Sequence, residues 1–359
     1  MFPADFAYAR ARSLDDAFDL LQEAQDADQE AKLIAGGQSL LPMMKLRLAA
    51  PQTLIDIADI EDLKGIKGWT AHAASGNLNV VIGALTTYRE LGTSCLFDGG
   101  LPVVRNETHA VVGGIPAFAD ALAVIADPQV RARGTIGGAI AHGDPAADLP
   151  AVLLALNAEV TIASRKGKHE ETRPPGHLAR RRAEEGSTAG KRVVPLDDFL
   201  QGIYTTDLAE DEIITHVRIN TQGAGASAYE KFPHPASHLP LAGVCAVVRL
   251  RNGRIDGAEV AVTGISPRPY RARATEQFLM GITPAPDSLA AAAAKVTVDF
   301  HPQGTAHVTA GSPGTGTGNP SGQVTLLGDQ HASAPYRAHL AEVLTRRALA
   351  KAIARAGTA

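Results

Sequence analysis

The sequence has little cysteine: only Cys95 and Cys245 occur among its 359 residues. An iron–sulfur cluster needs four thiolates, so any electron carrier on this chain is expected to be organic. Both cysteines lie in apolar surroundings, which predicts buried thiols in a reducing compartment. No stretch of 18 apolar residues occurs, which excludes a membrane-spanning helix by sequence. The start, "MFPADFAYAR", lacks the basic residues and apolar run of a Sec-type signal peptide. We therefore expect a cytoplasmic protein.

Several functional motifs are also absent. The net charge of -4 argues against nucleic acid or an anionic membrane as the main partner. No G-x-G-x-x-G stands between a strand and a helix, and no phosphate-binding G-x-x-x-x-G-K-[ST] occurs. His234 and His238 have i,i+4 spacing, but prolines interrupt the segment and no third ligand is close. No metal site and no catalytic residue is predicted in this chain.

The apolar fraction of 45% and the chain length allow two or three domains. Strands and helices mix up to about residue 222, and a smaller α+β unit follows. We predict domains at 1–222, with an internal division near 58, and at 223–359. The charged segment 165–192 and the Gly/Ser/Thr/Pro-rich segment 304–322 are predicted to be exposed excursions.

Two glycine-rich segments are the strongest candidates for ligand binding. "LIAGGQSLLPMMKLRL" places Gly36 and Gly37 between a predicted strand and a helix. "RARGTIGGAIAHGDPAADLPAVLL", residues 131–154, places Gly134, Gly137 and Gly138 before a helix that carries Asp148 near its start. Consecutive backbone N–H groups and a helix N-terminus attract anions, and a carboxylate suits a sugar diol. For either segment alone, a structural turn explains the glycines equally well.

Taken together, the two segments resemble the pyrophosphate-binding loops of the FAD-binding (medium) subunits of molybdenum-containing hydroxylases. This is the family of carbon monoxide dehydrogenase and xanthine dehydrogenase. Three further stretches, "YEKFPHPASHLPLAGVCAVVRL", "AEVAVTGISPRPYRA" and "SAPYRAHLAEVLTRRAL", are similar to its C-terminal flavoprotein domain. The resemblance implies an α+β fold: a two-subdomain FAD-binding domain of the vanillyl-alcohol-oxidase (PCMH) type, followed by a small sheet-plus-helices domain.

The resemblance also implies a set of cofactor-binding residues. These residues are Leu33, Ile34, Ala35, Gly36, Gly37, Gln38, Ser39, Leu40, Ile125, Thr135, Ile136, Gly137, Gly138, Ala139, Asp148, Tyr204, Ile214 and Lys231. Asp148 would lie near the adenosine end, Tyr204 near the isoalloxazine, and Lys231 would reach the flavin. Ile125 and Ile214 fit core positions equally well, Tyr204 fits an interface aromatic, and Lys231 fits a surface ion pair. Ala139 replaces an asparagine common in the family, which removes one expected hydrogen bond.

The activity implied by the resemblance is electron transfer. FAD would be bound non-covalently, because no histidine stands in an attachment motif and both cysteines are expected to be buried. Molybdopterin and [2Fe–2S] clusters would lie only on partners, a molybdenum large subunit and an iron–sulfur small subunit, in a dimer of heterotrimers. The FAD would deliver electrons to a small-molecule acceptor. Two alternatives stay open: a self-contained FAD-dependent oxidase, and an assembly subunit without flavin.

Overall fold

The computed structural model describes residues 2–72, 77–94, 114–165, 189–222, 226–298 and 326–357. The N-terminal part is a small parallel sheet in the order β1-β3-β2, flanked by helices. Its elements are β1 (Ala7–Arg10), α1 (Leu14–Asp26), β2 (Ala31–Ile34), α2 (Leu40–Lys45), β3 (Thr53–Asp56) and the 3-10 turn η1 (Glu61–Leu63). Ser13 caps α1 by accepting from the Asp16 amide at 3.1 Å, as its position before an acidic first turn predicts.

A five-stranded sheet in the order β4-β5-β10-β6-β7 forms the second part. Every neighbouring pair in this sheet is antiparallel. The strands are β4 (Ile66–His72), β5 (Asn77–Gly83), β6 (Glu159–Arg165), β7 (Ala189–Pro195) and β10 (Glu212–Gln222). The short strands β8 (Leu200–Gly202) and β9 (Thr205–Thr206) form a separate ribbon just before β10.

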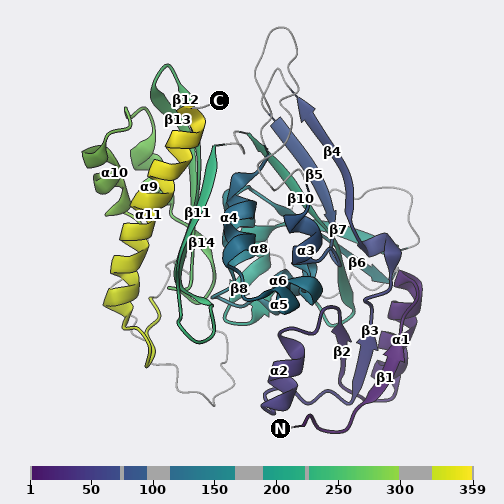
Figure 1. Cartoon of the computed structure of the whole chain (residues 1–359). Coiled ribbons are helices and arrows are strands. Elements are labelled where there is room, and N and C mark those ends of the chain that lie inside the picture. Colours follow the sequence, from purple (N-terminus) through teal and green to yellow (C-terminus); the bar gives the residue numbers. More distant parts are fainter. Residues whose placement is uncertain are drawn as a thin grey trace, which may run out of the picture.

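Short helices cover one face of this sheet (Figure 1). They are α3 (Tyr88–Gly92), α4 (Pro116–Val124), α5 (Pro128–Arg133), α6 (Ile136–His142), α7 (Asp148–Ala155) and α8 (Leu196–Phe199). Three of the six begin at a side-chain cap: Thr87 forms a capping box with Glu90, Asp127 caps α5, and Thr135 caps α6. The result is a layer of brief helices joined by tight turns, and these turns position the candidate site.

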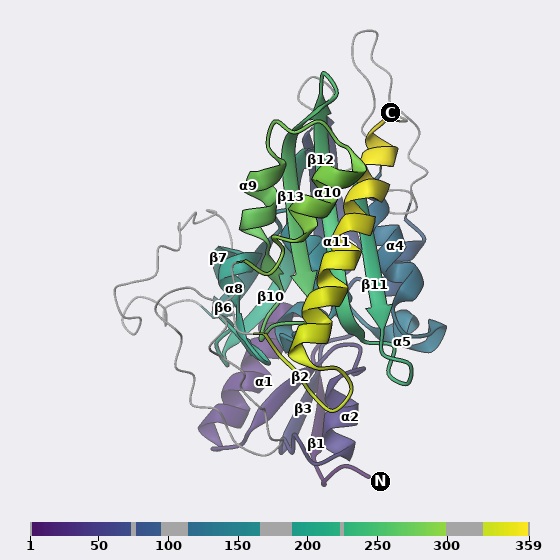
Figure 2. The same ribbon diagram turned by 90° about the vertical axis from the view of Figure 1, so that its left-hand side faces the viewer.

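The C-terminal part is a four-stranded antiparallel sheet, β11-β12-β13-β14, with three helices on its outer face (Figure 2). Its elements are β11 (Ser227–Pro233), β12 (Pro240–Arg251), β13 (Arg254–Thr263), β14 (Tyr270–Arg271), α9 (Arg273–Leu279), α10 (Pro286–Ala293) and α11 (Ala334–Gly357). Asn252 and Gly253 both have positive φ, 52° and 74°. This is the two-residue hairpin turn that the Asn-Gly pair predicts.

Both faces of the C-terminal sheet are buried, so β12 is apolar along most of its length. Val244, Ala246 and Val248 point to the side of α9–α11, whereas Cys245 and Val247 join the core shared with the helices α4, α6 and α7. This alternation follows from the period of two in a strand. The C-terminal sheet is therefore packed against the helix layer, and the predicted α+β architecture with a terminal sheet-plus-helices unit is confirmed.

The long helix α11 is fixed to α4 by a cluster of charges. Arg355 donates to both carboxylate oxygens of Asp120, at 2.7 and 3.0 Å, and to the Ser227 carbonyl at 2.6 Å. Lys351 lies 3.1 Å from the same carboxylate. Among the described residues, no helix has the length and apolar content required to cross a membrane.

The two segments predicted to be exposed excursions fall mostly outside the described residues. The excursion expected at 165–192 lies largely outside the described residues, but its ends are strands: Arg165 closes β6 and 189–192 belong to β7, because the two strands pair as a hairpin. The segment 304–322 and Cys95 lie wholly outside the described residues, whereas Cys245 is buried as expected. The domain limits stay a prediction.

The Asp120 cluster leads to a stability prediction. Burial acts to raise the pKa of Asp120, but the hydrogen bonds from Arg355 and the Tyr229 amide outweigh it and hold this pKa below its ordinary value. Asp120→Asn should therefore lower the free energy of unfolding at pH 7 by about 2 kcal/mol. A depressed carboxyl pKa contributes stability above the unfolded pKa of about 4, and this contribution is lost as the pH falls through the folded value. Urea unfolding at several pH values should show the variant and the wild type converging in acid; a constant difference would contradict the assignment.

Candidate functional site

The first glycine segment offers a row of unused backbone donors. Ala35 to Leu40 connect β2 to α2, and Ser39, at the N-cap of α2, makes no side-chain cap. None of the N–H groups of this run has an acceptor within the described residues. The run is half-buried to exposed. Unpaired amides at the start of a helix are the arrangement that binds anionic groups, which is what the sequence predicts here.

The glycines of this segment are required by the chain itself. A Cβ on Gly36 would lie 1.9 Å from the Arg133 carbonyl oxygen, so the first segment packs backbone to backbone against the end of α5. Gly37 has φ +71°, and a Cβ there would face Leu41 and Ile34 at 3.0 and 3.2 Å. The side-chain positions of both glycines thus point into the protein. Gly36 and Gly37 allow this turn to form, and in it the backbone N–H groups of residues 35–40 stay unpaired.

The second glycine segment differs from its sequence prediction. Instead of an open loop, helix α6 begins at Ile136, because Thr135 caps it by accepting from the Gly138 amide at 3.2 Å. The amides of Ile136 and Gly137 donate to the carbonyls of Thr86 and Ala84, and that of Ala139 donates to Thr135. A Cβ on Gly137 would lie 2.5 Å from that of Ala84. These donors are already used, so the expected anion-binding concavity is not formed here; a cofactor contact by this segment stays a prediction.

Contacts lead from the glycine segments to a buried carboxylate. Gly134, beside Gly36, packs under the ring of Tyr88, where a Cβ would meet the ring at 2.9 Å. Burial, and then the charges of Asp148 and Asp144, raise the pKa of Tyr88 above its ordinary range. The Tyr88 hydroxyl has no hydrogen-bond partner among the described residues. Tyr88 thus packs next to the first glycine segment through Gly134, and it is close enough to Asp148 for that charge to raise its pKa.

Asp148 begins α7 and is paired inside the protein. The Tyr229 hydroxyl donates to Oδ1 of the carboxylate at 2.7 Å. The Lys231 ammonium donates to Oδ2 at 2.9 Å, and its nitrogen also lies 2.9 Å from Oδ1. The side chains of Asp148 and Lys231 are 5% and 2% exposed. The ion pair is thus buried, unlike the surface pair considered from sequence. A carboxylate so engaged is also less available to a sugar diol than the sequence suggested.

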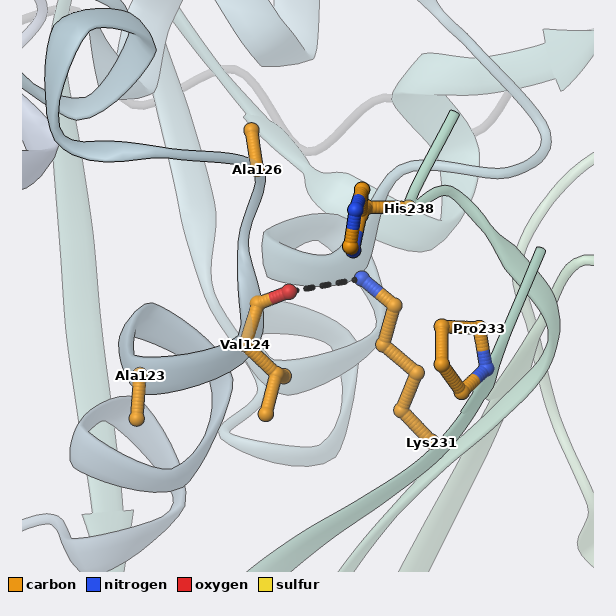
Figure 3. A pocket seen from close by; sticks show the side chains of 6 residues that line it. All are labelled: Ala123, Val124, Ala126, Lys231, Pro233 and His238. Carbon is orange, nitrogen blue, oxygen red and sulfur yellow. Dashed lines mark hydrogen bonds between the residues drawn. The ribbon is translucent and has the colours of Figure 1, made fainter. Parts of the chain in front are cut away.

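A pocket opens beside this pair, and Figure 3 shows its lining. It encloses about 220 Å³ and is lined by Ala123, Val124, Ala126, Lys231, Pro233 and His238. Lys231 donates to the Val124 carbonyl at 3.1 Å, and the His238 ring lies over the ammonium group in this view. Ligand pockets usually exceed about 300 Å³, so this one has room for only part of a dinucleotide-sized molecule.

Tyr204 lies at the far end of α6 from the glycines. Its amide donates to the Gly143 carbonyl at 3.0 Å, and its ring centroid lies 4.9 Å from that of His142. The backbone has φ +50° and the residue is 56% exposed. Burial lowers the pKa of His142, partly offset by Asp144, which favours the neutral imidazole. Tyr204 is held in a strained, solvent-facing position, as a ligand-contacting residue often is.

The remaining predicted residues are core positions. Ile125 ends α4 at 8% exposure and Ile214 lies on β10 at 6%, and both belong to the core between the two large sheets. Leu33 and Ile34 belong to β2. The packing of Ile125 and Ile214 on a cofactor stays a prediction. No group of three histidine, cysteine or acidic side chains that could hold a metal occurs in the described parts of the chain.

Comparison with known proteins identifies the family. A model described as the FAD-binding domain in molybdopterin dehydrogenase matches residues 4–180, and one described as the CO dehydrogenase flavoprotein C-terminal domain matches residues 227–311. The carbon monoxide dehydrogenase medium chain of Afipia carboxidovorans is 31% identical over 99% of both chains. This chain belongs to the FAD-binding medium subunits of molybdopterin dehydrogenases.

Further relatives agree with this membership. The glyceraldehyde dehydrogenase medium chain of Sulfolobus acidocaldarius is 30% identical over 84% of this chain and 90% of its own length. Among solved structures, a carbon monoxide dehydrogenase from Hydrogenophaga pseudoflava superposes with a TM-score of 0.73 at 33% identity, covering 99% of each chain. The protein is thus an oxidoreductase subunit with an FAD-binding domain, as the sequence resemblance predicts.

The residues present fit a dinucleotide cofactor of this kind. The run from Ala35 to Leu40 supplies unpaired donors for a pyrophosphate. Tyr88 and the Asp148–Lys231 pair supply polar groups in a largely apolar surrounding. That the first glycine segment and the Asp148–Lys231 pair contact the same cofactor stays a prediction.

Sequence reasoning missed four residues at this site: Tyr88, His142, Tyr229 and His238. Tyr229 had a usable signal, because it precedes Lys231 by two positions in a predicted strand and must share its face. His142 and His238 had none, since their positions depend on the end of α6 and on a turn with φ +58° at His238.

The first glycine segment gives a direct test. Gly37→Ala should weaken FAD binding roughly tenfold, because an L-residue resists φ +71° and shifts the N–H row. The dissociation constant of FAD, measured by flavin fluorescence on the apoprotein, reports the effect.

Gly253→Ala is the matched control. Gly253 also has positive φ, +74°, and nothing lies within 4 Å of its Cβ position, so both variants lose about 1 kcal/mol of stability. Equal FAD affinity in the two variants would show that Gly37 is only a turn residue.

Proposed function

We propose that this medium subunit is the FAD-carrying electron-transfer component of a heteromeric molybdenum hydroxylase. It would receive electrons from the [2Fe–2S] clusters of a small subunit and pass them to a small-molecule acceptor. A large subunit with the molybdenum cofactor would oxidise the substrate. The observation that carries the proposal is the similarity to named medium chains over nearly the whole length of both proteins.

The chemistry divides simply between cofactor and protein. Bound FAD supplies reversible acceptance and release of electrons. The chain would supply binding and electrostatics: free amides at 35–40 for the pyrophosphate, and the buried ammonium of Lys231. The buried pair carries no net charge, so it orients the ligand without adding a full charge to the site. The proposal requires no general acid or base from this chain.

The quaternary arrangement is part of the proposal. We infer a dimer of heterotrimers, consistent with the symmetry of most assemblies, located in the cytoplasm, where the buried free thiol of Cys245 stays reduced. Co-expression of the chain with a candidate large and small subunit should give a complex with all three cofactor types. That complex should turn over substrate with an external acceptor, whereas the isolated chain should not.

The same experiment separates the two alternatives raised by the sequence. A self-contained oxidase would consume substrate without any partner, and an assembly subunit would form the complex without flavin absorbance. Either result would contradict the proposed function.

The mode of FAD attachment is a separate prediction. Cys245 is buried, His142 ends helix α6, and no histidine of the sequence stands in an attachment motif, so the flavin should be non-covalent. Acid precipitation of the purified complex should release all yellow colour to the supernatant. Flavin that stays in the pellet would show a covalent bond.

A further inference from the structure

We propose that Tyr229 is a positioning residue of the cofactor site. By donating to Asp148 it fixes the Asp148–Lys231 pair, so that Lys231 presents its remaining N–H to the pocket. The inference rests on the proposed function, since FAD is the ligand that this pocket would receive in part. It assigns the C-terminal sheet a direct part in building the site.

The geometry of the pair leaves one donor of Lys231 for a ligand. An ammonium group has three N–H donors. One donates to the Val124 carbonyl at 3.1 Å and one to Asp148 at 2.9 Å. Because the side chain is 2% exposed, the third donor is not spent on bulk water. Its direction is fixed by the two bonds already made, and Figure 3 shows the Val124 carbonyl and the His238 ring next to the ammonium group.

The chain makes room for the Tyr229 hydroxyl. Tyr229 and Lys231 occupy the same face of β11, and Gly243 lies opposite Lys231 on β12. A Cβ on Gly243 would lie 2.3 Å from the Tyr229 hydroxyl oxygen. Only glycine at this position lets the phenol lie along the sheet and reach Asp148. The glycine and the tyrosine are therefore parts of one arrangement.

The C-terminal sheet also holds the backbone before Asp148. The Thr263 hydroxyl, at the end of β13, donates to the carbonyls of Pro145 and Ala147 at 2.8 and 2.9 Å. The Gly264 amide donates to Pro145 at 2.9 Å. Asp148 is thus fixed through its backbone by β13 and through its side chain by β11. Such double support is what keeps a ligand-binding geometry within narrow limits.

The groups around Asp148 determine whether loss of the Tyr229 hydroxyl raises or lowers the pKa of this carboxyl group. Burial raises the pKa of Asp148, Lys231 and Tyr229 lower it, and Asp144 raises it. The carboxylate is also close enough to Tyr88 of α3 to raise the pKa of that phenol, and His238 is drawn next to the Lys231 ammonium group in Figure 3. Loss of the Tyr229 hydroxyl removes one contribution that favours the ionised form, so the pKa of Asp148 rises further. The Asp148 carboxylate of the variant is then protonated at a higher pH than that of the wild type.

The test is the FAD dissociation constant of the full chain between about pH 6 and about pH 8.5. Tyr229→Phe should weaken binding roughly tenfold at the acid end, with a smaller loss at the alkaline end. Asp148→Asn should weaken binding without this pH dependence, and the double variant should equal Asp148→Asn, because the phenol acts only through the carboxylate.

Tyr270→Phe is the matched control. Tyr270 is a second buried tyrosine of the same sheet, 2% exposed, whose hydroxyl donates to the Val296 carbonyl at 2.9 Å on the other face. It should lose similar stability and keep wild-type FAD affinity at every pH. If Tyr229→Phe behaves like Tyr270→Phe in FAD affinity, the positioning role is wrong while the proposed function stands. A wild-type chain that binds no FAD contradicts the proposed function itself.

A second variant covers the case in which Tyr229→Phe does not fold. Gly243→Ala keeps the hydroxyl but displaces it from Asp148, because its Cβ would overlap the phenol oxygen. It should reproduce the acid-enhanced loss of FAD affinity. Wild-type binding by a folded Gly243→Ala chain would overturn the inference.

Discussion

The buried carboxylate of Asp148 is the point on which the candidate site depends. A charge removed from water is stable only if it is paired and hydrogen-bonded. Here the compensation comes from two side chains of β11, Tyr229 and Lys231. Lys231 in turn binds the carbonyl that closes α4. One desolvated charge therefore forces α7, β11 and α4 into a fixed arrangement, and the pocket in Figure 3 lies where these elements meet.

Close backbone contacts impose a second constraint. Gly36 lies against the Arg133 carbonyl, and Gly137 lies against Ala84. Contacts of this kind leave no space for side chains, so the glycines are explained by packing before any ligand is considered. Their functional effect is indirect. The Gly36 contact fixes the turn from Ala35 to Leu40 against the end of α5, and the amides of that turn stay unpaired. The candidate anion site thus consists of the backbone N–H groups that the turn leaves without acceptors.

Much of the fold was predictable because its signals are local. Ser13 and Thr87 cap helices, Asn252-Gly253 forms a hairpin turn, and the last apolar pattern forms α11. The helix α6 was missed because Thr135 caps it only when Thr86 and Ala84 take the amides of Ile136 and Gly137. Such bonds join distant parts of the chain, and no local pattern contains them.

The candidate site shows the same difference between residues with a local sequence signal and contacts between distant parts of the chain. The resemblance led to Asp148 and Lys231, but neither periodicity nor spacing could show that they pair with each other, 83 positions apart. The burial of that pair also overturned the surface reading of Lys231. The room that Gly243 leaves for a phenol on the neighbouring strand is equally invisible in sequence. The sequence does not show how far a charged group is desolvated, because desolvation depends on all the atoms packed around that group.

The C-terminal sheet is accordingly more than a domain attached to an FAD-binding fold. One face of it packs on α9–α11, and the other contributes Tyr229, Cys245 and Val247 to the core beneath the helix layer. Asp120 links the same layer to Arg355 near the end of α11. A displacement of this sheet would break the supports of Asp148 together, since Tyr229 and Thr263 belong to it. The charge at the pocket and the packing of the sheet are therefore physically coupled, and a change that loosens one should be felt in the other.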